Sequence, residues 1–384
     1  MNILVIHNYY RKSGGEDEVV NREVAILKMN NHMVYLYAVS NRQIDSYYRK
    51  CITLKNLRYS KYHYRRIKQT ICNYNIGIVH VHNTFPLISS SVYDACNDTR
   101  VPVVQTLHNF RMICAAGSLS SIEGRCKSCM SGHFLPAVLG RCYRRSSFLT
   151  FLVIRMINYH KMNKTWLKKI DCYIAPSDFT RRIYVNAGFP HHKIIVKPHC
   201  VNDLQSVHSR KNRFSALFVG RLTEEKGIHT LLKAMEKITV PLRIVGDGPL
   251  RRVVENRCMS NIKYIGYLSN ADVLREMLQA LFVIIPSLSY ETFGLVAIES
   301  FMAETPVISS KLGALEEIVE DGVTGIHFTP GDSKELAEKI SWLYSNPSEC
   351  IRMGENARRL YEMKYECKHN YEKLIELYSS IQNT

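Results

Sequence analysis

The sequence has no long hydrophobic run. No window holds about 18 uninterrupted apolar residues, the length that a helix needs to span a bilayer, so no transmembrane segment is expected. Residues 1–7 form only a short apolar run without an upstream basic region or cleavage site, so we expect a first strand here and not a signal peptide. Twelve cysteines without a secretion signal favour a reducing, cytoplasmic compartment, where disulfides are rare.

Acidic residues are scarce in the first half of the chain. Residues 1–200 hold 29 Lys and Arg but 10 Asp and Glu, a net charge of +19. The remaining residues hold 22 basic and 24 acidic side chains, a net charge of −2. This asymmetry indicates an anionic partner for the first half. A basic nucleic-acid-binding protein is one alternative, although this half lacks a recognisable nucleic-acid motif.

The 384 residues suffice for two domains with sizeable cores. Apolar runs of strand length alternate with helical segments, which predicts an α/β fold with parallel, doubly wound sheets. We place the boundary at residue 200, within a polar linker over 197–213. In the first half, strands are expected over 3–6, 33–37, 76–81, 101–107 and 171–177, and helices over 16–29, 47–74 and 178–186. In the second half, strands are expected over 216–220, 242–245, 263–268 and 280–286, with a helix over 228–237.

The most informative stretch follows the apolar run 280–286. A loop there leads into an apolar-periodic segment over 295–303, which we interpret as a helix with Thr292 as its N-cap. We expect Gly294 to let the backbone approach a ligand, because the first amides of a helix form an anion site. Glu291 and Glu299 flank this site, and carboxylates suit hydroxyls better than phosphate. The pattern therefore indicates a ligand that is part sugar and part phosphate.

The stretch Ser-Tyr-Glu291-Thr-Phe-Gly-Leu-Val-Ala-Ile-Glu299 resembles the E-x7-E motif of the retaining glycosyltransferases of family GT4, which have the GT-B fold. The resemblance extends over 305–309 and 313–325 and reaches back to 219–227. It implies two Rossmann-like domains that face each other across a cleft. Residues 1–200 would be the acceptor domain and 201–364 the nucleotide-sugar domain, with the last helix, 365–384, packed back on the first domain.

The resemblance also implies a set of donor-binding residues. Arg221 and Lys226 follow a predicted strand, and their charges suit a diphosphate. Glu299 would hold the ribose, whereas Glu291 would hold the transferred sugar and belong to the catalytic residues. The remaining donor contacts, several of them through the backbone, would come from Gly246, Leu268, Phe293, Gly294 and Leu295.

Two features of the first half have a place in the same family pattern. His108 follows a predicted strand, and in similar proteins a histidine here contacts the transferred sugar, often as His-Asp, so the resemblance implies that His108 is a catalytic residue. Here the next residue is Asn109. The alternative is an ordinary hydrogen-bonded loop histidine. Gly14 and Gly15 lie in a loop between a strand and a helix, where similar transferases place a turn that faces the donor phosphates and the acceptor.

Four cysteines lie close together in the sequence: Cys114, Cys126, Cys129 and Cys142. Cys126 and Cys129 form a C-x2-C pair, and four thiolates could close a tetrahedral zinc site. The second pair lacks this tight spacing. Reduced cysteines in an irregular loop are therefore an equal alternative to a structural zinc.

The expected function is transfer of a sugar from a UDP- or GDP-sugar to an acceptor hydroxyl, with retention and without a catalytic cofactor. A GT-B-like nucleotide-sugar epimerase is the enzymatic alternative. The apolar stretch 148–154 lies between basic residues at 144–145 and 161–169, a composition that fits an interfacial helix, although a core helix with a basic edge fits too. By resemblance we expect a lipid-linked saccharide acceptor in cell-surface polysaccharide synthesis, with the protein peripheral on the inner face of the cell membrane.

Overall fold

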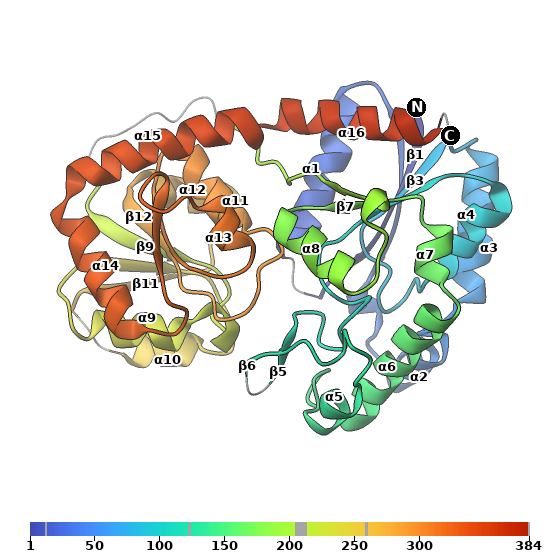
Figure 1. The fold of residues 1–384 in the computed structure, drawn as a ribbon, viewed down its shortest axis with the longest axis horizontal. Coiled ribbons are helices and arrows are strands. Elements are labelled where there is room, and N and C mark those ends of the chain that lie inside the picture. Colours follow the sequence, from blue (N-terminus) through green and yellow to red (C-terminus); the bar gives the residue numbers. More distant parts are fainter. Residues whose placement is uncertain (12–13, 122–123, 204–212, 258–259, 383–384) are drawn as a thin grey trace. The chain divides into compact units, whose positions relative to one another are not determined.

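The computed structural model describes residues 1–11, 14–121, 124–203, 213–257 and 260–382. The chain divides into two compact units, one formed by residues 1–199 and 368–384 and the other by residues 200–367 (Figure 1). Most of the polar linker expected over 197–213 lies outside the described residues. Each unit has a parallel sheet with helices packed on it.

The first unit is built on a six-stranded sheet of order β2-β1-β3-β4-β7-β8, and every strand pair in it is parallel. Its elements are β1 (Asn2–Tyr9), α1 (Gly15–Met29), β2 (Met33–Ser40), η1 (Asn41–Gln43), α2 (Tyr47–Asn56), α3 (Lys61–Asn73), β3 (Ile78–Val81), α4 (Ser91–Thr99), β4 (Val103–Thr106), β5 (Ser120–Ser121), β6 (Gly124–Arg125), α5 (Leu135–Leu139), α6 (Ser147–Met162), α7 (Thr165–Lys169), β7 (Cys172–Ala175), α8 (Asp178–Asn186), η2 (His191–Lys193), β8 (Ile194–Val196) and α16 (Cys367–Gln382).

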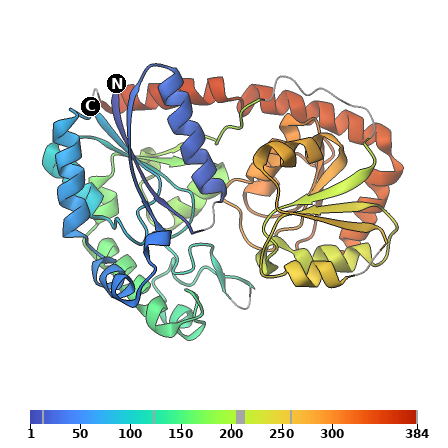
Figure 2. The same ribbon diagram turned by 180° about the vertical axis from the view of Figure 1, so that it is seen from behind.

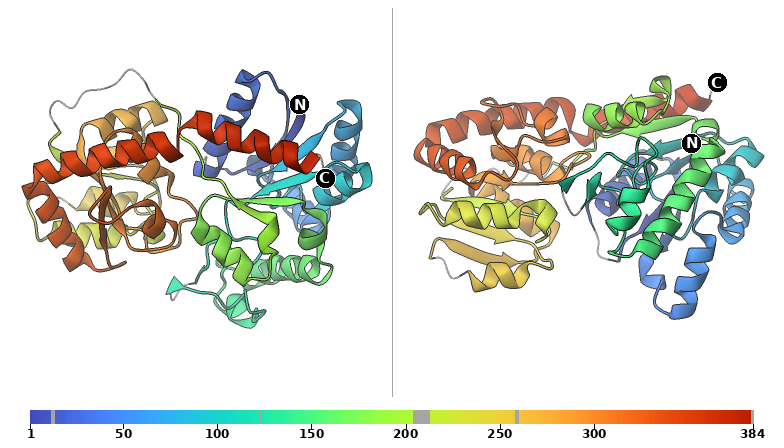
Figure 3. Two further views of the ribbon diagram at one scale, coloured as in Figure 1. Left: turned by 45° about the horizontal axis from the view of Figure 1, so that its top comes forward. Right: turned by 60° about the horizontal axis from the view of Figure 1, so that its bottom comes forward.

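The core of the first unit joins both ends of the sequence. Ile3 and Val5 of β1 pack with Val20 and Val24 of α1, and the same cluster contains Tyr378 of α16. Figure 2 shows α1 beside the strands of this sheet, and in Figure 3 α16 lies along the same unit. Strands β3, β4 and β7 are buried along their whole length, as expected where helices cover both sides of a parallel sheet.

The second unit has a six-stranded sheet of order β11-β10-β9-β12-β13-β14, again parallel throughout. Its elements are β9 (Ser215–Val219), η3 (Glu224–Lys226), α9 (Ile228–Met235), β10 (Leu242–Val245), α10 (Arg251–Asn256), β11 (Ile262–Gly266), α11 (Asn270–Leu278), β12 (Ala280–Ile285), α12 (Leu295–Met302), β13 (Val307–Ser310), α13 (Ala314–Ile318), β14 (Gly325–Phe328), α14 (Ser333–Ser345) and α15 (Pro347–Lys364). This strand order is that of a dinucleotide-binding Rossmann sheet. The predicted fold class, two Rossmann-like domains, is confirmed.

Two helical segments differ from the prediction. The stretch 47–74 is two helices and not one, because the Ser60 hydroxyl accepts a hydrogen bond from the His63 amide and caps a new helix, α3. The carboxyl-terminal helix starts at Cys367, after a break in which Glu366 pairs with Val201 in a β-bridge. None of the described helices combines the length and the apolar composition needed to cross a bilayer.

Candidate active site

The sheet of the second unit reverses its strand order between β9 and β12. Ligands of open α/β sheets bind outside the carboxyl ends of the strands at such a switch point. Lys226 is in the loop after β9, and Glu291 is in the loop after β12. The two loops are joined by a hydrogen bond from the Leu288 amide to the Glu225 carbonyl at 2.8 Å. The topology therefore brings the Lys226 and Glu291 loops to one edge of the sheet.

Lys226 and Glu291 form an ion pair at this edge, with 2.5 Å between Lys226 Nζ and Glu291 Oε1. The Ser287 hydroxyl donates to the same carboxylate oxygen at 2.7 Å. Burial would raise the pKa of Glu291, but the Lys226 charge and the hydrogen bonds from Lys226 and Ser287 outweigh it and hold that pKa below its ordinary value. Glu291 is therefore an ionised acceptor at neutral pH. Arg221 is more exposed, and its guanidinium lies 3.6 Å from the Glu225 carboxylate.

The neighbouring strand ends carry further predicted donor residues. Gly246 follows β10 with φ of 140°, and a Cβ built on it would lie 1.9 Å from the Gly220 carbonyl oxygen. Any side chain at this position would therefore collide with the loop that precedes Arg221. Leu268 follows β11 and is half-buried. Gly246 and Leu268 thus belong to the same carboxyl edge of the sheet as Arg221 and Lys226.

The start of α12 differs from the prediction. The N-cap is Gly294, without a side-chain cap, so the expectation of Thr292 as N-cap is wrong. Gly294 has φ of 109°, and a Cβ there would lie 2.8 Å from Leu315 Cδ2, so the glycine is required by backbone conformation and by packing against α13. Phe293 is buried, with its ring centroid 5.9 Å from that of Tyr365. Glu299 is half-buried in α12.

In the first unit, His108 follows β4 and belongs to a row of histidines. His108 Nε2 lies 2.8 Å from His82 Nδ1, and its ring is also stacked on His199 with centroids 5.0 Å apart. Burial, together with the neighbouring histidines, holds the pKa of His108 well below its usual value. Burial likewise lowers the pKa of His82 to about 3 and that of His199 to about 3. These rings are therefore neutral at physiological pH.

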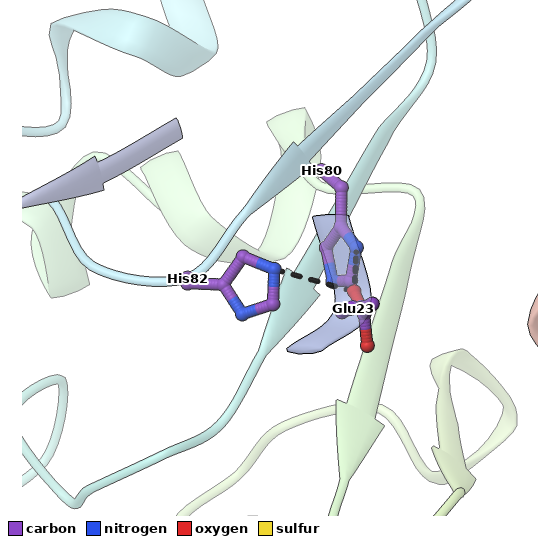
Figure 4. Close-up of side chains that lie close together, drawn as sticks. All are labelled: Glu23, His80 and His82. Carbon is purple, nitrogen blue, oxygen red and sulfur yellow. Dashed lines mark ion pairs between the residues drawn. The ribbon is translucent and has the colours of Figure 1, made fainter. Parts of the chain in front are cut away.

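A buried carboxylate supports this row (Figure 4). Glu23 Oε1 lies 2.8 Å from His80 Nδ1 and 3.3 Å from His82 Nε2, and its other oxygen is 3.4 Å from the Lys197 ammonium. Burial opposes the charge of Glu23, but His80 and Lys197 outweigh burial and hold its pKa well below the ordinary value. Sequence reasoning missed this group. The sequence feature that could have indicated this buried group is a pair of histidines, His80 and His82, at the end of an otherwise apolar strand.

The two predicted glycines lie at the start of α1, and not both in the loop before it. Gly14 is the N-cap of α1, and its amide donates to Asp17 Oδ2 at 3.3 Å, while Gly15 is the first helical residue. The next residue, Glu16, accepts hydrogen bonds from Tyr10 at 3.1 Å and from the Asn109 amide at 3.3 Å. Where similar proteins often have an aspartate after the histidine, Asn109 thus contacts a carboxyl group supplied by α1.

Two family models match the chain. The model described as "Glycosyl transferases group 1" matches residues 202–360, and the model described as "Glycosyltransferase Family 4" matches residues 18–203. The two matches lie end to end and together run from residue 18 to residue 360, so a glycosyltransferase model matches most of each half of the chain. Its two sheets are those of a GT-B glycosyltransferase fold.

One relative and two solved structures illustrate the likeness. O-antigen chain mannosyltransferase C of Escherichia coli is 30% identical over 248 residues, which cover 58% of this chain and 64% of the relative, less than two thirds of its length. HepE of Anabaena, solved in complex with UDP and with UDP-glucose, has a TM-score of 0.71 at 19% identity, over 99% of this chain and 100% of HepE. Sucrose-phosphate synthase of Thermosynechococcus elongatus has a TM-score of 0.72 at 18% identity, over 99% and 98% of the two chains. At these identities the structures establish the fold alone.

Proposed function

We propose that this protein transfers a sugar from a nucleotide diphosphate sugar to an acceptor hydroxyl. The observation that carries the proposal is the Lys226–Glu291–Ser287 group at the switch point of the second unit, in a segment that matches a glycosyltransferase model. A cation next to an ionised carboxylate suits a ligand that joins phosphate to hydroxyls. The complex of HepE with UDP-glucose supports a donor of this kind.

The proposed roles follow from the charge of each group. When the sugar leaves, negative charge develops on the diphosphate, and Lys226, Arg221 and the first amides of α12 would stabilise it. Glu291, held ionised, would accept a hydrogen bond from a sugar hydroxyl, with the Phe293 and Gly294 backbone beside it. Glu299 would bind the ribose hydroxyls, and Gly246, Leu268 and Leu295 would complete the donor site.

The first unit would bind the transferred sugar and the acceptor. A neutral His108 can exchange a hydrogen bond with a sugar hydroxyl without adding charge, and Gly14 and Gly15 would face the donor phosphates and the acceptor. We propose that the anomeric configuration is retained, as implied by the resemblance to family GT4, and that no cofactor takes part in the chemistry. Analysis of the product by NMR spectroscopy tests retention, because an inverted anomer would contradict it.

Donor screening is the direct test of the function. UDP, GDP and ADP, each with and without an attached sugar, are added to the protein, and the melting temperature is measured. One nucleotide series should raise it, because a ligand that binds only the folded state stabilises that state. Slow release of free sugar from the same donor should accompany binding. An epimerised sugar would favour an epimerase, and no response to any nucleotide would contradict the proposal.

We further propose that the acceptor is lipid-linked and that the first unit docks on an anionic membrane. Exposed apolar side chains lie on three helices of the first unit, of which α2 and α6 carry basic and no acidic residues: Tyr47 and Tyr48 of α2, Leu135 and Leu139 of α5, and Phe148 and Phe151 of α6. We call this set the apolar-basic surface. Helices α5 and α6 pack together, and a groove between α2 and α6 is lined by Leu54 and Leu152. The O-antigen role named for the Escherichia coli relative supports such an acceptor.

Burial reduces the number of side chains in the stretch 148–154 that could contact a membrane. Val153 and Ile154 of the apolar stretch 148–154 are buried in the core, so Phe148 and Phe151 are the side chains that could enter a bilayer. Lys169 is paired with Asp94, which makes it a poor choice for neutralisation. Arg144 and Arg145 are exposed and flank α6. Each basic residue near an anionic surface contributes about 1 kcal/mol to binding.

Flotation with phosphatidylglycerol vesicles tests this docking. Wild-type protein should float at low salt and less at high salt, because salt screens the attraction. Phe148→Ser with Phe151→Ser, and separately Arg144→Gln with Arg145→Gln, should each reduce flotation. The matched controls are Ile351→Ser and Lys233→Gln, which change exposed side chains of the second unit and should float like wild type. Protein that ignores anionic vesicles at low salt would contradict membrane docking and point to a soluble acidic acceptor.

A further inference from the structure

The loop between β4 and α6 carries groups that the proposed donor site does not use. The predicted zinc ligands in it are all free thiols: Cys114, Cys126, Cys129 and Cys142. Among the described residues, the group whose metal-binding atoms all lie within 4.8 Å of one another is a different one, Glu23, His80 and His82. There the Lys197 ammonium, 3.4 Å from the Glu23 carboxylate, already supplies a cation. The zinc site therefore stays a prediction, and another residue of this loop, Arg111, is the better-defined candidate for a ligand.

Arg111 lies three residues after His108, and two aromatic rings hold its guanidinium group. The guanidinium carbon is 4.7 Å from the centroid of the Phe85 ring and 5.1 Å from that of the Tyr143 ring. Ring faces attract a cation without neutralising it. Burial lowers the pKa of Arg111, but an arginine remains protonated at physiological pH. The loop after β4 therefore holds a fixed positive charge.

The loop is folded around this guanidinium group but does not use all of its hydrogen-bond donors. Nη1 of Arg111 donates to the Ala115 carbonyl, and Nη2 donates to the Ala116 carbonyl at 2.9 Å. Gly117 leaves room for the group, because its φ is 80° and a Cβ on it would lie 2.8 Å from Nη2. Nε has no hydrogen-bond partner among the described residues and is not one of their buried unpaired atoms, so solvent reaches it. Arg111 therefore keeps N–H donors for a ligand.

Arg111 lines a cavity of about 50 Å³ together with His82, Asn83, His108 and Asn109, residues that follow β3 and β4. Among the described residues that line this cavity, Arg111 is the one formally charged side chain, and none is a carboxylate. Both histidines are neutral, because burial lowers their pKa values. The potential in the cavity is therefore positive. A water molecule needs about 10–15 Å³ of such a cavity, so there is room for several waters or for one small anionic group.

The Glu16 carboxyl group interacts with the charge of Arg111 but does not neutralise it. Among the described residues, Arg111 forms no ion pair, and Glu16 Oε2 instead accepts hydrogen bonds from Tyr10 at 3.1 Å and from Asn109 at 3.3 Å. Burial raises the pKa of Glu16 to about 8, which keeps most of it protonated at neutral pH. A cation held away from water without a counter-ion costs free energy, and such groups in cavities are candidates for binding sites. The charge of Arg111 is therefore available to an anionic ligand.

We propose that Arg111 binds an oxyanion group, a carboxylate or a phosphate, on the acceptor sugar. A guanidinium group binds either of them through parallel N–H donors, which fixes the orientation of the ligand as well as its position. The excess of positive charge in residues 1–200 would attract such an acceptor. The oxyanion keeps its charge during the transfer, so Arg111 would select and orient the acceptor and would not act on the leaving diphosphate. The inference rests on the proposed transferase function and names its acceptor as an acidic saccharide.

Calorimetric titration of the full chain with small sugars tests this site without any donor. The probes are glucuronate and glucose 6-phosphate, with neutral glucose for comparison, all at the same ionic strength. At least one acidic sugar should bind, and its identity shows whether the site takes a carboxylate or a phosphate. Arg111→Gln should raise its Kd about tenfold or more, because a hydrogen bond between two charged groups is lost. The matched control, Arg65→Gln, removes the same charge from an exposed arginine of α3 and should leave Kd unchanged. Binding of neither acidic sugar, equal binding of glucose, or an equal loss in Arg65→Gln would overturn the proposal.

A second measurement applies if Arg111→Gln fails to fold. Phenylglyoxal modifies arginine side chains, and mass spectrometry of the wild-type protein measures the rate at each of them. The acidic sugar that binds should slow the modification of Arg111 and leave that of Arg65 unchanged, whereas glucose should protect neither. If Arg111 is modified at the same rate with and without the acidic sugar, the proposal is wrong.

Failure of this site and failure of the transferase proposal give different results. The screen with UDP, GDP and ADP tests the donor, whereas the acidic sugars test Arg111. Protein that binds a nucleotide but neither acidic sugar would contradict the acidic acceptor alone. Protein that binds an acidic sugar through Arg111 but no nucleotide would contradict the transferase function and support the oxyanion site.

Discussion

The two units have the same kind of sheet, yet the charged groups at the carboxyl ends of their strands differ. In the second unit, the switch point between β9 and β12 carries a compact ion pair, Lys226 with Glu291, near the exposed Arg221. In the first unit, the loops after β3 and β4 carry neutral histidines, His82 and His108, and the nearest carboxylate, Glu23, is compensated internally by Lys197.

Under the proposed function, this difference assigns a separate part of the substrates to each unit. The second unit presents ionised side chains, Lys226 paired with Glu291 and Arg221 3.6 Å from Glu225, so under the proposed function it suits the part of the donor whose charge changes. The first unit presents neutral hydrogen-bonding groups, so it suits sugar hydroxyls, whose charge does not change. Desolvation of neutral rings costs far less than that of an unpaired charge. The predictions below test this division, beginning with the charged site.

Removal of the cation in the second unit should have the largest effect. Lys226→Met takes away the charge that would stabilise the leaving diphosphate, so kcat should fall by about 10²- to 10³-fold. The measurement is turnover with the donor identified by screening. Lys233→Met, which changes an exposed lysine of α9, is the matched control and should keep wild-type turnover. Equal losses in both variants would mean that the effect is not specific to the switch point.

The placement of the Glu291 loop between a strand and a helix could be predicted because these elements are local in sequence. Strand β12, the loop with Glu291 and helix α12 follow one another, so the motif and the geometry coincide. The backbone conformation at the start of α12 was not predicted, because Gly294, with its positive φ, is the N-cap of the helix and Thr292 is not. The first unit was harder, because the group around Glu23 joins elements far apart in the chain. For example, His80 contacts Tyr378, which lies 298 residues away, and no sequence pattern encodes that contact.

The two glutamates of the second unit should differ in what their removal changes. Glu299→Gln should weaken binding of the free nucleotide by about 1–3 kcal/mol, because the ribose would lose a hydrogen bond to a charged acceptor. Glu291→Gln should lower turnover and leave free-nucleotide affinity nearly intact. Isothermal titration calorimetry and steady-state kinetics separate the two effects. Identical changes in both parameters for both variants would contradict the assigned roles.

The buried carboxyl group of Glu16 in the first unit should make the free energy of unfolding depend on pH. The Glu16 side chain is half-buried, but its Oε1 is buried and has no hydrogen-bond partner among the described residues. Burial is the main cause that raises the pKa of Glu16 to about 8, and the nearby Asp17 carboxylate raises it further. The hydrogen bonds from Tyr10 and Asn109 and the charge of Arg111 oppose this rise. The folded state therefore keeps a proton that the unfolded chain loses above the ordinary glutamate pKa of 4.5.

Because the pKa of Glu16 is raised in the folded state, stability should decrease as the pH rises. The contribution of Glu16 is fully present below the unfolded pKa and is lost as the pH rises through about 8. Between pH 6 and 8, wild type should lose about 2 kcal/mol relative to Glu16→Gln, because each unit of pH in this window costs about 1.4 kcal/mol. Chemical denaturation of both proteins at several pH values measures the difference. Parallel stability curves would show that Glu16 is ionised in the folded state.

The smallest effect is expected from His82, which we assign as a positioning residue for His108. The ionised Glu23 carboxylate lies 3.3 Å from His82 Nε2, which favours the tautomer with its proton on Nε2 and leaves Nδ1 as an acceptor. His108 Nε2–H would then donate to His82 Nδ1 across 2.8 Å, which fixes the ring that we propose contacts the sugar. Loss of one such hydrogen bond costs about 0.5–1.5 kcal/mol, which corresponds to a change in rate of up to about tenfold.

Two substitutions of His82 separate positioning from a purely structural role. In His82→Asn the side-chain oxygen can take the place of Nδ1 and still accept from His108, whereas in His82→Gln the amide reaches toward Glu23 instead. Both remove the ring and should lower the melting temperature alike. We therefore expect kcat to fall about tenfold in His82→Gln and clearly less in His82→Asn, with KM for the donor little changed. If kcat falls equally in both variants, in step with their melting temperatures, the contact between His82 and His108 does not matter for turnover. The row of histidines would then contribute to stability alone, and His82 would not be a positioning residue for His108.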